Sequence, residues 1–403
     1  MKKNHLISLS NNKRTTIKMF VMNCCCWILL LYVGSILTAC SDEDSVKKNP
    51  YLSTCTRAML KEAVEVRFLN LDKNTNIHID FGDGTIKEGM STDVITHKYT
   101  QSGDYTMNVT AGEHKIQKRI RVYNLLALTE AMKQFKDPNY KKVWVMTHRA
   151  HTTDLTIPEN SIPSVSAAIK SGAEIIECDT HVTKDGVVVV CHDQTLNATT
   201  NGSGDITKMT FEEIEKSLES ITSEEIQKYN LKDRNGNLTD EKIPTLEAFL
   251  KAGRGKIYFN LDYSPRTAST KQVFDIVKKL EMTESVLFYC NSEQKVKEVL
   301  DLDQDAHAYP WVGTHKALVG LPGTYFIQGS YMTNGKSTDV SEGIADGMIV
   351  SIGMLAWTGS DVSEYELNET YLEDLLAIFP DVKMIMTDVP KELIKALKQR
   401  GKR

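Results

Sequence analysis

The sequence predicts a small all-β sandwich followed by an α/β domain in which eight strand–helix units close into a parallel barrel. Three observations carry this prediction. Residues 64–109 hold short runs of alternating apolar and polar residues and no helical period, as expected for strands with one buried face. Beyond residue 142, apolar runs alternate with amphipathic segments, which is typical of parallel α/β folds. About eight such units over roughly 260 residues favour a closed barrel.

The composition is that of a globular protein and argues against nucleic acid as the main partner. Of the 403 residues, 41% are hydrophobic and 25% are charged, and the net charge is −5. The basic residues before Cys40 have no acidic counterpart there, so the rest of the chain is more acidic than the whole. Sequence-independent affinity for a phosphate backbone depends on basic surface. We therefore expect no nucleic-acid partner.

The first forty residues have the features of a lipoprotein signal. A basic leader at residues 13–18 precedes the uncharged apolar run 24–39. The run ends in Leu37-Thr38-Ala39-Cys40, which resembles a lipobox, where the chain is cut before a cysteine whose thiol accepts diacylglycerol. A plain membrane anchor is the alternative, but the position of Cys40 at the very end of the run favours cleavage and lipidation. We expect a signal peptide at 1–39 and an outer-membrane lipoprotein that faces the periplasm or the cell surface.

Residues 40–60 are expected to form an acidic tether. Ser41-Asp42-Glu43-Asp44 resembles the surface-export tag of some Gram-negative lipoproteins, and a solvated linker explains it equally well. The cysteines after Cys40 show no CxxC spacing, so we expect buried free thiols and neither disulfides nor a metal knuckle.

The first domain is expected at residues 61–124. Strands are predicted at 64–68, 76–80 and 105–109, and a turn with two glycines at Asp80-Phe81-Gly82-Asp83-Gly84. With His97-Lys98-Tyr99, these residues resemble the PKD-type sandwich, the polycystic-kidney-disease repeat. The resemblance implies a stiff spacer, or a contact surface for a glycan or a protein. For the two aspartates we expect a turn-forming role rather than Ca²⁺ binding.

The barrel is expected at residues 142–403, after a connecting helix and linker at 125–141. The polar stretch 193–240 is too long for a simple connection, so we expect an insertion on the barrel rim. The strand candidates are 143–147, 174–180, 187–191, 256–262, 286–290, 306–310, 325–328, 347–351 and 383–387. The helix candidates are 161–171, 211–217, 246–251, 269–281, 293–300, 369–379 and 391–399.

Ionisable side chains follow the first three strand candidates, where barrel strands carry catalytic groups. Glu177 and Asp179 are two residues apart on one strand and therefore share a face, where paired carboxylates suit a hard cation such as Mg²⁺ or Ca²⁺. His148 and His192 can supply a general base and a general acid. The planar guanidinium of Arg149 matches phosphate oxygens. The combination suggests phosphodiester cleavage.

An ordered series of motifs extends this pattern over residues 142–400. It comprises His148-Arg149, Pro158-Glu159-Asn160-Ser161, Gly172-Ala173-Glu174-Ile175-Ile176-Glu177-Cys178-Asp179, Lys184-Asp185-Gly186, Val190-Cys191-His192-Asp193, Leu196 with Thr199-Thr200-Asn201-Gly202, Ile243-Pro244-Thr245-Leu246-Glu247 and Thr387-Asp388-Val389-Pro390. Together they strongly resemble the glycerophosphodiester phosphodiesterase family. The resemblance implies a TIM-type barrel and a divalent metal ion, with a glycerol hydroxyl attacking first to give a cyclic phosphate that water opens.

The resemblance also implies roles for individual residues. His148 and His192 are the acid and base, Glu177 and Asp179 hold the metal, and Arg149 contacts the phosphate. We place Glu159 against the substrate or behind the residues that touch it; a carboxylate at a helix N-terminus is the alternative.

Three positions depart from the family pattern. Ala150 stands where a glycine usually follows His-Arg, and Ala198 where an arginine is common. The third departure is Asn260-Leu261-Asp262 in place of Glu-x-Lys. We expect Asp262 to be the third carboxylate on the metal, with Asn260 giving an amide oxygen or holding a water, and Arg149 alone left to hold the phosphate. In the alternative, Asp262 pairs with a basic side chain and Asn260 is the ligand.

The leading hypothesis is a phosphodiesterase that releases glycerol 3-phosphate from glycerophosphodiesters. A phospholipase-like relative acting on lipid head groups is a second possibility. A surface-binding lipoprotein with an inactive barrel is a third, favoured by the altered strand and opposed by the intact histidines and carboxylates.

Overall fold

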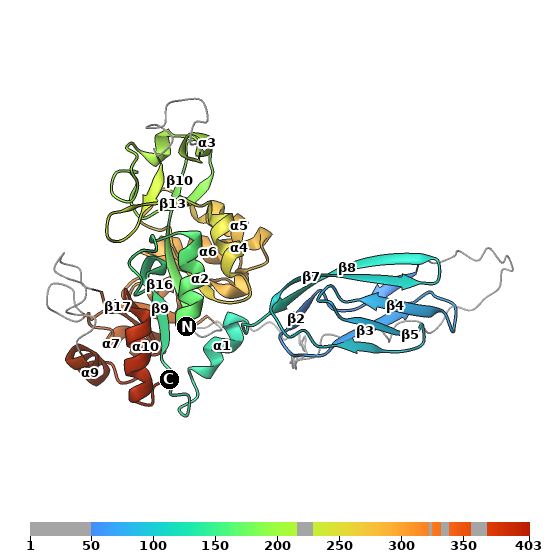
Figure 1. Cartoon of the computed structure of the whole chain (residues 1–403). Coiled ribbons are helices and arrows are strands. Elements are labelled where there is room, and N and C mark those ends of the chain that lie inside the picture. The colour runs from blue at the N-terminus through green and yellow to red at the C-terminus, as the bar shows by residue number, and fades with distance from the viewer. Residues whose placement is uncertain (1–49, 216–228, 322–324, 332–337, 356–368) are drawn as a thin grey trace, which may run out of the picture. The chain divides into compact units, whose positions relative to one another are not determined.

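The computed structural model describes residues 50–215, 229–321, 325–331, 338–355 and 369–403 (Figure 1). The predicted signal peptide, Cys40 and most of the predicted tether lie outside these residues, as do the last two residues of the helix expected at 211–217. Among the described helices, none has the length and apolar character that crossing a membrane requires.

The N-terminal domain is a β-sandwich of two sheets. A three-stranded sheet has the order β1-β3-β6, and a five-stranded sheet has the order β2-β8-β7-β4-β5. Along β3, residues alternate strictly between buried and exposed, as the sequence pattern predicts. The inward faces form one core that includes Val66, Ile79 and Val109. The strands are β1 (Tyr51–Ser53), β2 (Arg57–Met59), β3 (Val64–Leu69), β4 (Asn76–Asp80), β5 (Ile86–Met90), β6 (Ile95–His97), β7 (Gly103–Ala111) and β8 (His114–Tyr123).

The sandwich begins ten residues earlier than the sequence boundary of 61, so the predicted extent of the tether is wrong. β1 pairs with β3, and β2 pairs with β8. Both strands have only three residues, too few for an alternating pattern to stand out in the sequence.

The glycine-rich turn has the geometry expected for its aspartates. A carboxylate oxygen of Asp80 accepts from the amide of Gly82 at 2.8 Å, and one of Asp83 accepts from Thr85 at 3.0 Å. The second oxygen of Asp83 lies 2.7 Å from Nε2 of His97. The aspartates therefore support the turn and its neighbouring strand.

The second domain is a nearly closed barrel of eight parallel strands in chain order. The last strand, β19, pairs with the first, β9, and β16 and β17 meet through the bridge between Trp311 and Gln328. The strands are β9 (Trp144–Thr147), β10 (Ile175–Val182), β14 (Tyr258–Asp262), β15 (Val286–Cys290), β16 (His307–Pro310), β17 (Phe326–Ser330), β18 (Ile349–Gly353) and β19 (Met384–Thr387).

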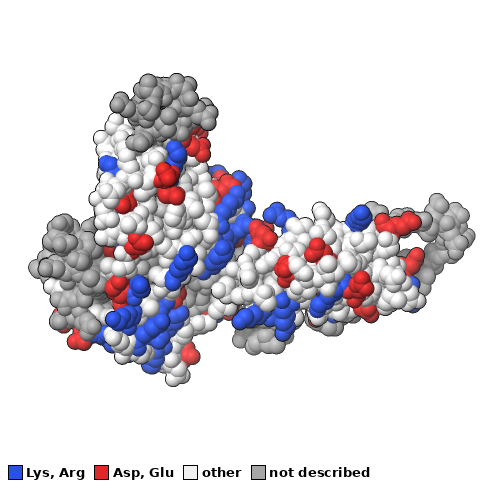
Figure 2. All heavy atoms as spheres, in the orientation of Figure 1, with Lys and Arg blue, Asp and Glu red and all other residues white. Residues whose placement is uncertain are grey.

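Helices surround the barrel and begin at capping residues that the sequence supplies. Ser161 and Ser269 each form a capping box at the start of α2 and α5. Charged side chains of both signs lie on the face shown in Figure 2. Among the ion pairs of the helices, Glu247 of α4 contacts Lys251 at 2.6 Å and Lys279 of α5 at 2.8 Å. The helices are α2 (Ile162–Ser171), α4 (Leu246–Gly253), α5 (Thr270–Lys279), α6 (Glu293–Leu302), α7 (Ser341–Ala345), α9 (Glu369–Ile378) and α10 (Pro390–Gln399).

Large apolar side chains fill the half of the barrel that lies at the N-terminal ends of the strands. Trp144, Tyr258, Tyr309 and Phe326 pack there in one cluster with Phe135, just after the connecting helix α1 (Leu128–Gln134). The ring of Phe135 lies 5.0 Å from Trp144 and 5.2 Å from Phe326, measured between centroids. This packing fills the N-terminal end of the barrel, so polar groups gather at the C-terminal ends of the strands.

The strand expected at 187–191 is not a barrel strand. The observed strand, β11 (Val188–Val190), runs antiparallel to β10 and forms a hairpin with it. With α3 (Phe211–Glu215), β12 (Asn230–Lys232) and β13 (Leu238–Lys242), it builds a rim subdomain with its own small core. A fully apolar run fits a barrel strand or a buried hairpin equally well, which explains the error.

Cys178, Cys191 and Cys290 are buried thiols, as expected, whereas Cys55 is exposed. Burial raises the pKa of the Cys191 thiol to about 12. These thiols are therefore packing groups rather than nucleophiles.

Candidate functional site

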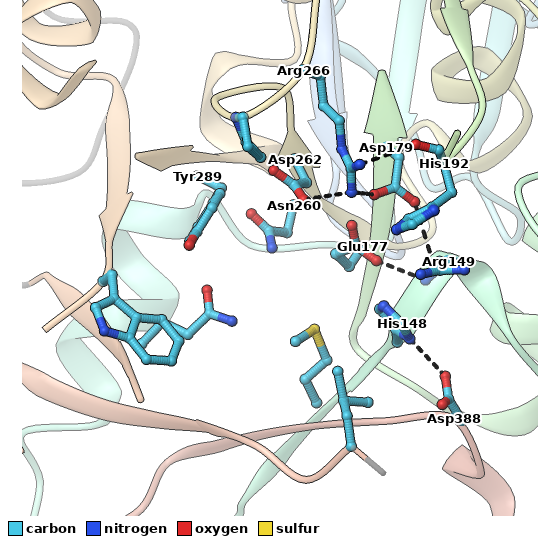
Figure 3. Close-up of a pocket in the computed structure, with 15 residues that line it drawn as sticks. His148, Arg149, Glu177, Asp179, His192, Asn260, Asp262, Arg266, Tyr289 and Asp388 are labelled. Carbon is cyan, nitrogen blue, oxygen red and sulfur yellow. Dashed lines mark hydrogen bonds and ion pairs between the residues drawn. The ribbon is translucent and has the colours of Figure 1, made fainter. Parts of the chain in front are cut away.

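A cavity of about 520 Å³ opens at the C-terminal ends of the barrel strands (Figure 3). One side carries the ionisable residues and the opposite side is largely aromatic and apolar. The lining residues are His148, Arg149, Glu177, Asp179, His192, Asn260, Asp262, Pro265, Arg266, Tyr289, Trp311, Gln328, Leu355, Met386 and Asp388.

Three carboxylates converge in this cavity because of strand register. Glu177 lies opposite Asn260 and Asp179 lies opposite Asp262 on the parallel pair β10 and β14. Alternate residues share a face, so Cys178 and Leu261 point into the core instead. Carboxylate oxygens of Glu177, Asp179 and Asp262 all lie within 4.8 Å of one another. The predicted set of carboxylates is therefore together at one place.

The charge of this cluster is incompletely balanced by the protein. Burial, followed by the charges of Asp179 and Asp262, raises the pKa of Glu177 well above its ordinary value. Burial and the charge of Asp179 likewise raise the pKa of Asp262 to about 7, against the opposing effect of Arg266. Oδ1 of Asn260 and Oδ1 of Asp262 are buried and have no hydrogen-bond partner in the described part of the chain. Oxygen atoms left in this way fit a hard divalent cation.

Arg266 is a site residue that the sequence analysis missed. Its guanidinium lies 2.6 Å from Asp179 and 3.3 Å from Asp262, and it also donates to the carbonyl of His192 at 3.0 Å. A second guanidinium therefore lines the cavity beside Arg149, and its contact with Asp262 is the pairing with a basic side chain that the alternative for Asp262 expected. Arg266 lies in the loop after β14, four residues beyond Asp262, where no strand pattern marks it.

A strained turn after β9 positions Arg149. Arg149 and Ala150 both have positive φ, at 51° and 55°. The left-handed conformation costs roughly 1–2 kcal/mol for a residue with a Cβ, which explains why a glycine suits position 150. The turn aims the amide of Arg149 at Glu177 Oε2, at 2.7 Å. Burial opposes the charge on Arg149, but Glu159 and Asp179 outweigh it and raise its pKa.

Each predicted catalytic histidine has a carboxylate on Nδ1. His148 Nδ1 lies 2.8 Å from Asp388, and His192 Nδ1 lies 2.8 Å from Asp193. Figure 3 shows both rings beside Arg149 and Glu177. His192 reaches the cavity because the β10–β11 hairpin returns the chain to the rim, where the backbone amide of Cys191 donates to the backbone carbonyl of Asp179. Among the described residues, no hydrogen-bond partner is found for Nε2 of either ring.

Glu159 lies behind the cavity and does not line it. Its carboxylate lies 3.4 Å from Arg149 and 3.0 Å from His151. Burial alone would raise the pKa of Glu159, but the hydrogen bond from His151 and the charge of Arg149 lower it to about 2. Glu159 thus supports Arg149 rather than contacting a ligand directly.

Tyr289 of β15, Trp311 just after β16 and Gln328 of β17 form an uncharged wall of the cavity, which Leu355 and Met386 also line. The sequence analysis did not select them, although Tyr289 belongs to an expected strand and Trp311 directly follows one. Asp388 was also missed, despite lying in the Thr387-Asp388-Val389-Pro390 motif. A position at or just after the end of an expected strand was a usable signal for Tyr289, Trp311 and Asp388.

Comparison with known proteins matches both domains. Residues 148–316 match the model of the Glycerophosphoryl diester phosphodiesterase family, and residues 51–116 match that of the PKD domain. A "Glycerophosphodiester phosphodiesterase" of Caldanaerobacter subterraneus subsp. tengcongensis is 36% identical over 122 residues, 30% of this chain and 45% of that protein. The mouse "Glycerophosphodiester phosphodiesterase 1" is 37% identical over 106 residues, 26% of this chain and 29% of that protein. The matched part is thus less than half of each relative.

A solved structure confirms the fold of the barrel. A glycerophosphoryl diester phosphodiesterase from Parabacteroides distasonis superposes with a TM-score of 0.55 and 21% identity, covering 69% of this chain and 94% of that one.

Proposed function

We propose that this protein, whose residues 148–316 form a domain of the glycerophosphoryl diester phosphodiesterase family, is a metal-dependent enzyme. It would hydrolyse glycerophosphodiesters to glycerol 3-phosphate and an alcohol. One observation carries the proposal: a three-carboxylate cluster with unpartnered oxygens shares a cavity with two guanidinium groups and two histidines. Three carboxylates and two guanidinium groups leave one net negative charge. A divalent cation together with a monoanionic phosphodiester neutralises it.

The metal would be held by Glu177, Asp179 and Asp262, with the amide oxygen of Asn260 beside them. These oxygen donors suit Mg²⁺ or Ca²⁺. When bound, such an ion stabilises negative charge on the phosphoryl oxygens.

The remaining steps use side chains of this chain. Arg149 and Arg266 bind the phosphate oxygens and hold the diester in one orientation. One of His148 and His192 removes a proton through Nε2 from the attacking hydroxyl, from glycerol or water. The other protonates the departing alkoxide. Asp388 and Asp193 fix the ring orientations because each accepts at Nδ1.

The wall of Tyr289, Trp311 and Gln328 would bind the organic part of the substrate. Aromatic rings pack well against small alcohols and their C–H groups, and the Gln328 amide offers a donor and an acceptor for hydroxyls. A cavity of about 520 Å³ accommodates a small glycerophosphodiester.

We also propose that Cys40 carries the lipid that anchors the protein to the outer membrane. The PKD domain would then act as a spacer, or as a contact surface for a glycan or protein. The support for this proposal is the sequence pattern at 13–44 alone.

A substrate panel tests the proposed activity. Purified protein is incubated with glycerophosphocholine, glycerophosphoethanolamine, phosphatidylcholine vesicles and sphingomyelin vesicles, with Mg²⁺, with Ca²⁺ and with chelator. We expect glycerol 3-phosphate from the first two, lost with chelator and restored by metal. Release of head groups from vesicles would favour the phospholipase-like alternative, and binding without turnover would favour an inactive barrel.

A further inference from the structure

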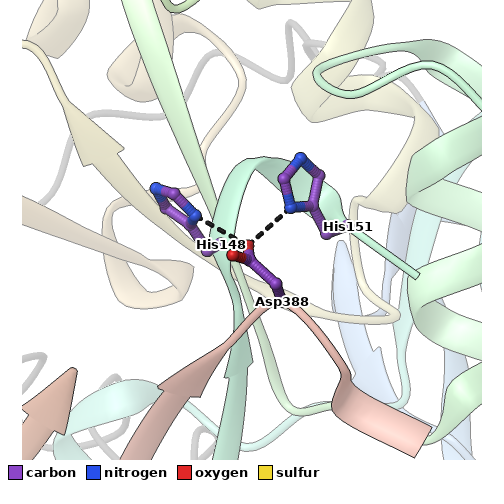
Figure 4. A group of neighbouring side chains, drawn as sticks. All are labelled: His148, His151 and Asp388. Atoms are coloured by element: carbon purple, nitrogen blue, oxygen red, sulfur yellow. Dashed lines mark hydrogen bonds and ion pairs between the residues drawn. The ribbon is translucent and has the colours of Figure 1, made fainter. Parts of the chain in front are cut away.

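His148 and His151 lie on either side of Asp388, and both rings reach the same carboxylate oxygen (Figure 4). The left-handed turn at Arg149 and Ala150 places the two rings with their centroids 5.6 Å apart. Nδ1 of His148 lies 2.8 Å from Asp388 Oδ1, and Nδ1 of His151 lies 2.5 Å from that oxygen.

Both ring nitrogens of His151 face carboxylates. Nε2 lies 3.0 Å from Glu159 Oε2, opposite the Nδ1 contact with Asp388. A neutral imidazole has one N–H and one lone pair, so one of these contacts would set a lone pair against an anionic oxygen. An imidazolium donates to both. The residue is 7% exposed, so water does not replace either contact.

The electrostatics of the surroundings agree with a charged ring. Burial lowers the pKa of His151, but the hydrogen bonds to Asp388 and Glu159 outweigh burial and raise it. Arg234 acts in the opposite direction from the rim, where its guanidinium donates to the carbonyl of Thr152 at 2.9 Å. Burial would raise the pKa of Asp388, but the two histidines lower it well below its ordinary value. Arg149 is a further charged group nearby, held at 3.4 Å from Glu159.

We propose that His151 is a positioning residue: as a buried imidazolium it binds Asp388 and Glu159 together, and so sets both the orientation and the proton affinity of His148. The inference rests on the proposed function for the role of His148 in turnover. A cation that shares the oxygen of Asp388 weakens the pull of that carboxylate on the proton of His148. Removing that cation should therefore strengthen the hold of Asp388 on the proton of His148.

The test removes the positive charge and keeps one hydrogen bond to the carboxylates. In His151→Gln, the amide donates to one carboxylate and carries no charge. Removing a positive charge about 5–6 Å away should raise the pH at which His148 titrates by about one to two units. The matched control is His97→Gln, because His97 is also 7% exposed and lies 2.7 Å from a carboxylate, that of Asp83 in the β-sandwich.

Histidine-labelled protein is followed by NMR from pH 5 to pH 9, with His148 assigned by its loss in His148→Ala. We expect both His151 ring nitrogens to carry protons through neutral pH, and an upward shift of the His148 midpoint in His151→Gln only. In the pH profile of kcat, the limb set by His148 should move by the same amount. A midpoint that moves by less than about 0.3 unit, or a neutral His151 at pH 7, overturns the proposal.

The NMR titration needs no turnover, so it separates failure of this inference from failure of the proposed function. If His151→Gln does not fold, His151→Gln/Glu159→Gln removes the carboxylate that loses its histidine partner and keeps only Arg149. A smaller upward shift is expected there, because losing the negative charge of Glu159 opposes losing the positive charge of His151. An unchanged His148 midpoint in that folded double variant overturns the proposal equally.

Discussion

Asp179 and Asp262 lie opposite each other on the neighbouring parallel strands β10 and β14, and their side chains enter the same cavity. The family resemblance led us to expect Glu-x-Lys on β14, and the strand carries Asn260 and Asp262 instead. The expected glutamate of Glu-x-Lys is replaced by Asn260, but a carboxylate returns two residues later. Arg266 supplies the positive charge that the missing lysine would have given.

The first prediction concerns the third metal ligand. Asp262→Asn should weaken Mg²⁺ or Ca²⁺ binding by at least about tenfold, roughly 1.4 kcal/mol, because it removes a carboxylate whose Oδ1 has no hydrogen-bond partner among the described residues. Isothermal titration calorimetry measures this directly. Asp233→Asn removes another buried carboxylate, in the rim, and should leave metal binding unchanged. A normal titration for Asp262→Asn with a large loss for Asn260→Ala would assign the ligand to Asn260.

The second prediction concerns pH and stability without metal. The folded-state pKa of Asp262 is raised from 3.8 to about 7, and that of Glu177 is also raised. A raised carboxyl pKa gives stability that is present below about pH 4 and lost as the pH rises through the folded value. The raised pKa of His151 likewise gives stability that is lost as the pH rises, over a higher pH range. Metal-free protein should therefore melt at a higher temperature at pH 6 than at pH 8.

Added metal should reverse this trend, because binding requires the ionised carboxylates and releases protons. Thermal melts in chelator and in excess Ca²⁺ check both statements. Equal melting temperatures at pH 6 and pH 8 in chelator would show that ionisation of these carboxylates does not destabilise the fold. The lowered pKa values of Glu159 and Asp388 act at more acidic pH and do not affect this comparison.

The third prediction separates catalysis from folding at the two histidines. His148→Ala and His192→Ala should each lower kcat by about 10²–10⁴, the range expected for one acid or base group. Neither ring is in the core, and Asp388 keeps its bond to His151 when His148 is removed. Melting temperatures should therefore change little. A variant that keeps more than about a third of the wild-type rate would exclude that residue from the chemistry.

The fourth prediction concerns the aromatic wall. Trp311→Ala should raise KM for glycerophosphocholine by about tenfold while changing kcat less, because the indole contacts the organic part and not the phosphate. Trp311→Phe keeps an aromatic surface and is expected to retain most of the affinity. If the alanine variant loses kcat with KM unchanged, Trp311 acts on the reacting groups instead.

The fifth prediction concerns the N-terminus. Cys40→Ser should move the protein from the membrane fraction to soluble or unprocessed forms, because the serine hydroxyl cannot accept the thioether-linked lipid. Cell fractionation and metabolic labelling with a fatty acid measure the change. Normal processing and membrane attachment of Cys40→Ser would show that another feature anchors the protein.

Sequence patterns identified the barrel because strands and helices alternate with distinct periods. They also placed Glu177, Asp179, Asn260 and Asp262 correctly on inward faces, since side-chain direction follows from strand alternation. The hairpin strand β11 was wrongly assigned to the barrel because an all-apolar run does not reveal its partner or direction. His192 was still found because its strand-end position holds in either arrangement.

Residues brought in by loops and turns could not be found in this way. Arg266 lies in a loop after β14, and its contact with Asp179 spans 87 positions in sequence. His151 joins the site through two residues of positive φ, a conformation that Arg149 and Ala150 do not signal by residue type. Contacts of this kind depend on tertiary structure, so only the folded chain shows them.

The most direct test of the central claim is ³¹P NMR of glycerophosphocholine during incubation with the purified protein and Mg²⁺ or Ca²⁺. The account predicts that the diester signal converts to glycerol 3-phosphate, that chelator stops the conversion, that renewed metal restores it, and that Glu177→Gln is inactive. Conversion to phosphocholine would show that the bond between phosphate and glycerol is cleaved, and not the bond between phosphate and choline. Turnover that continues in chelator, or the absence of turnover with metal present, would contradict a metal-dependent glycerophosphodiesterase in this cavity.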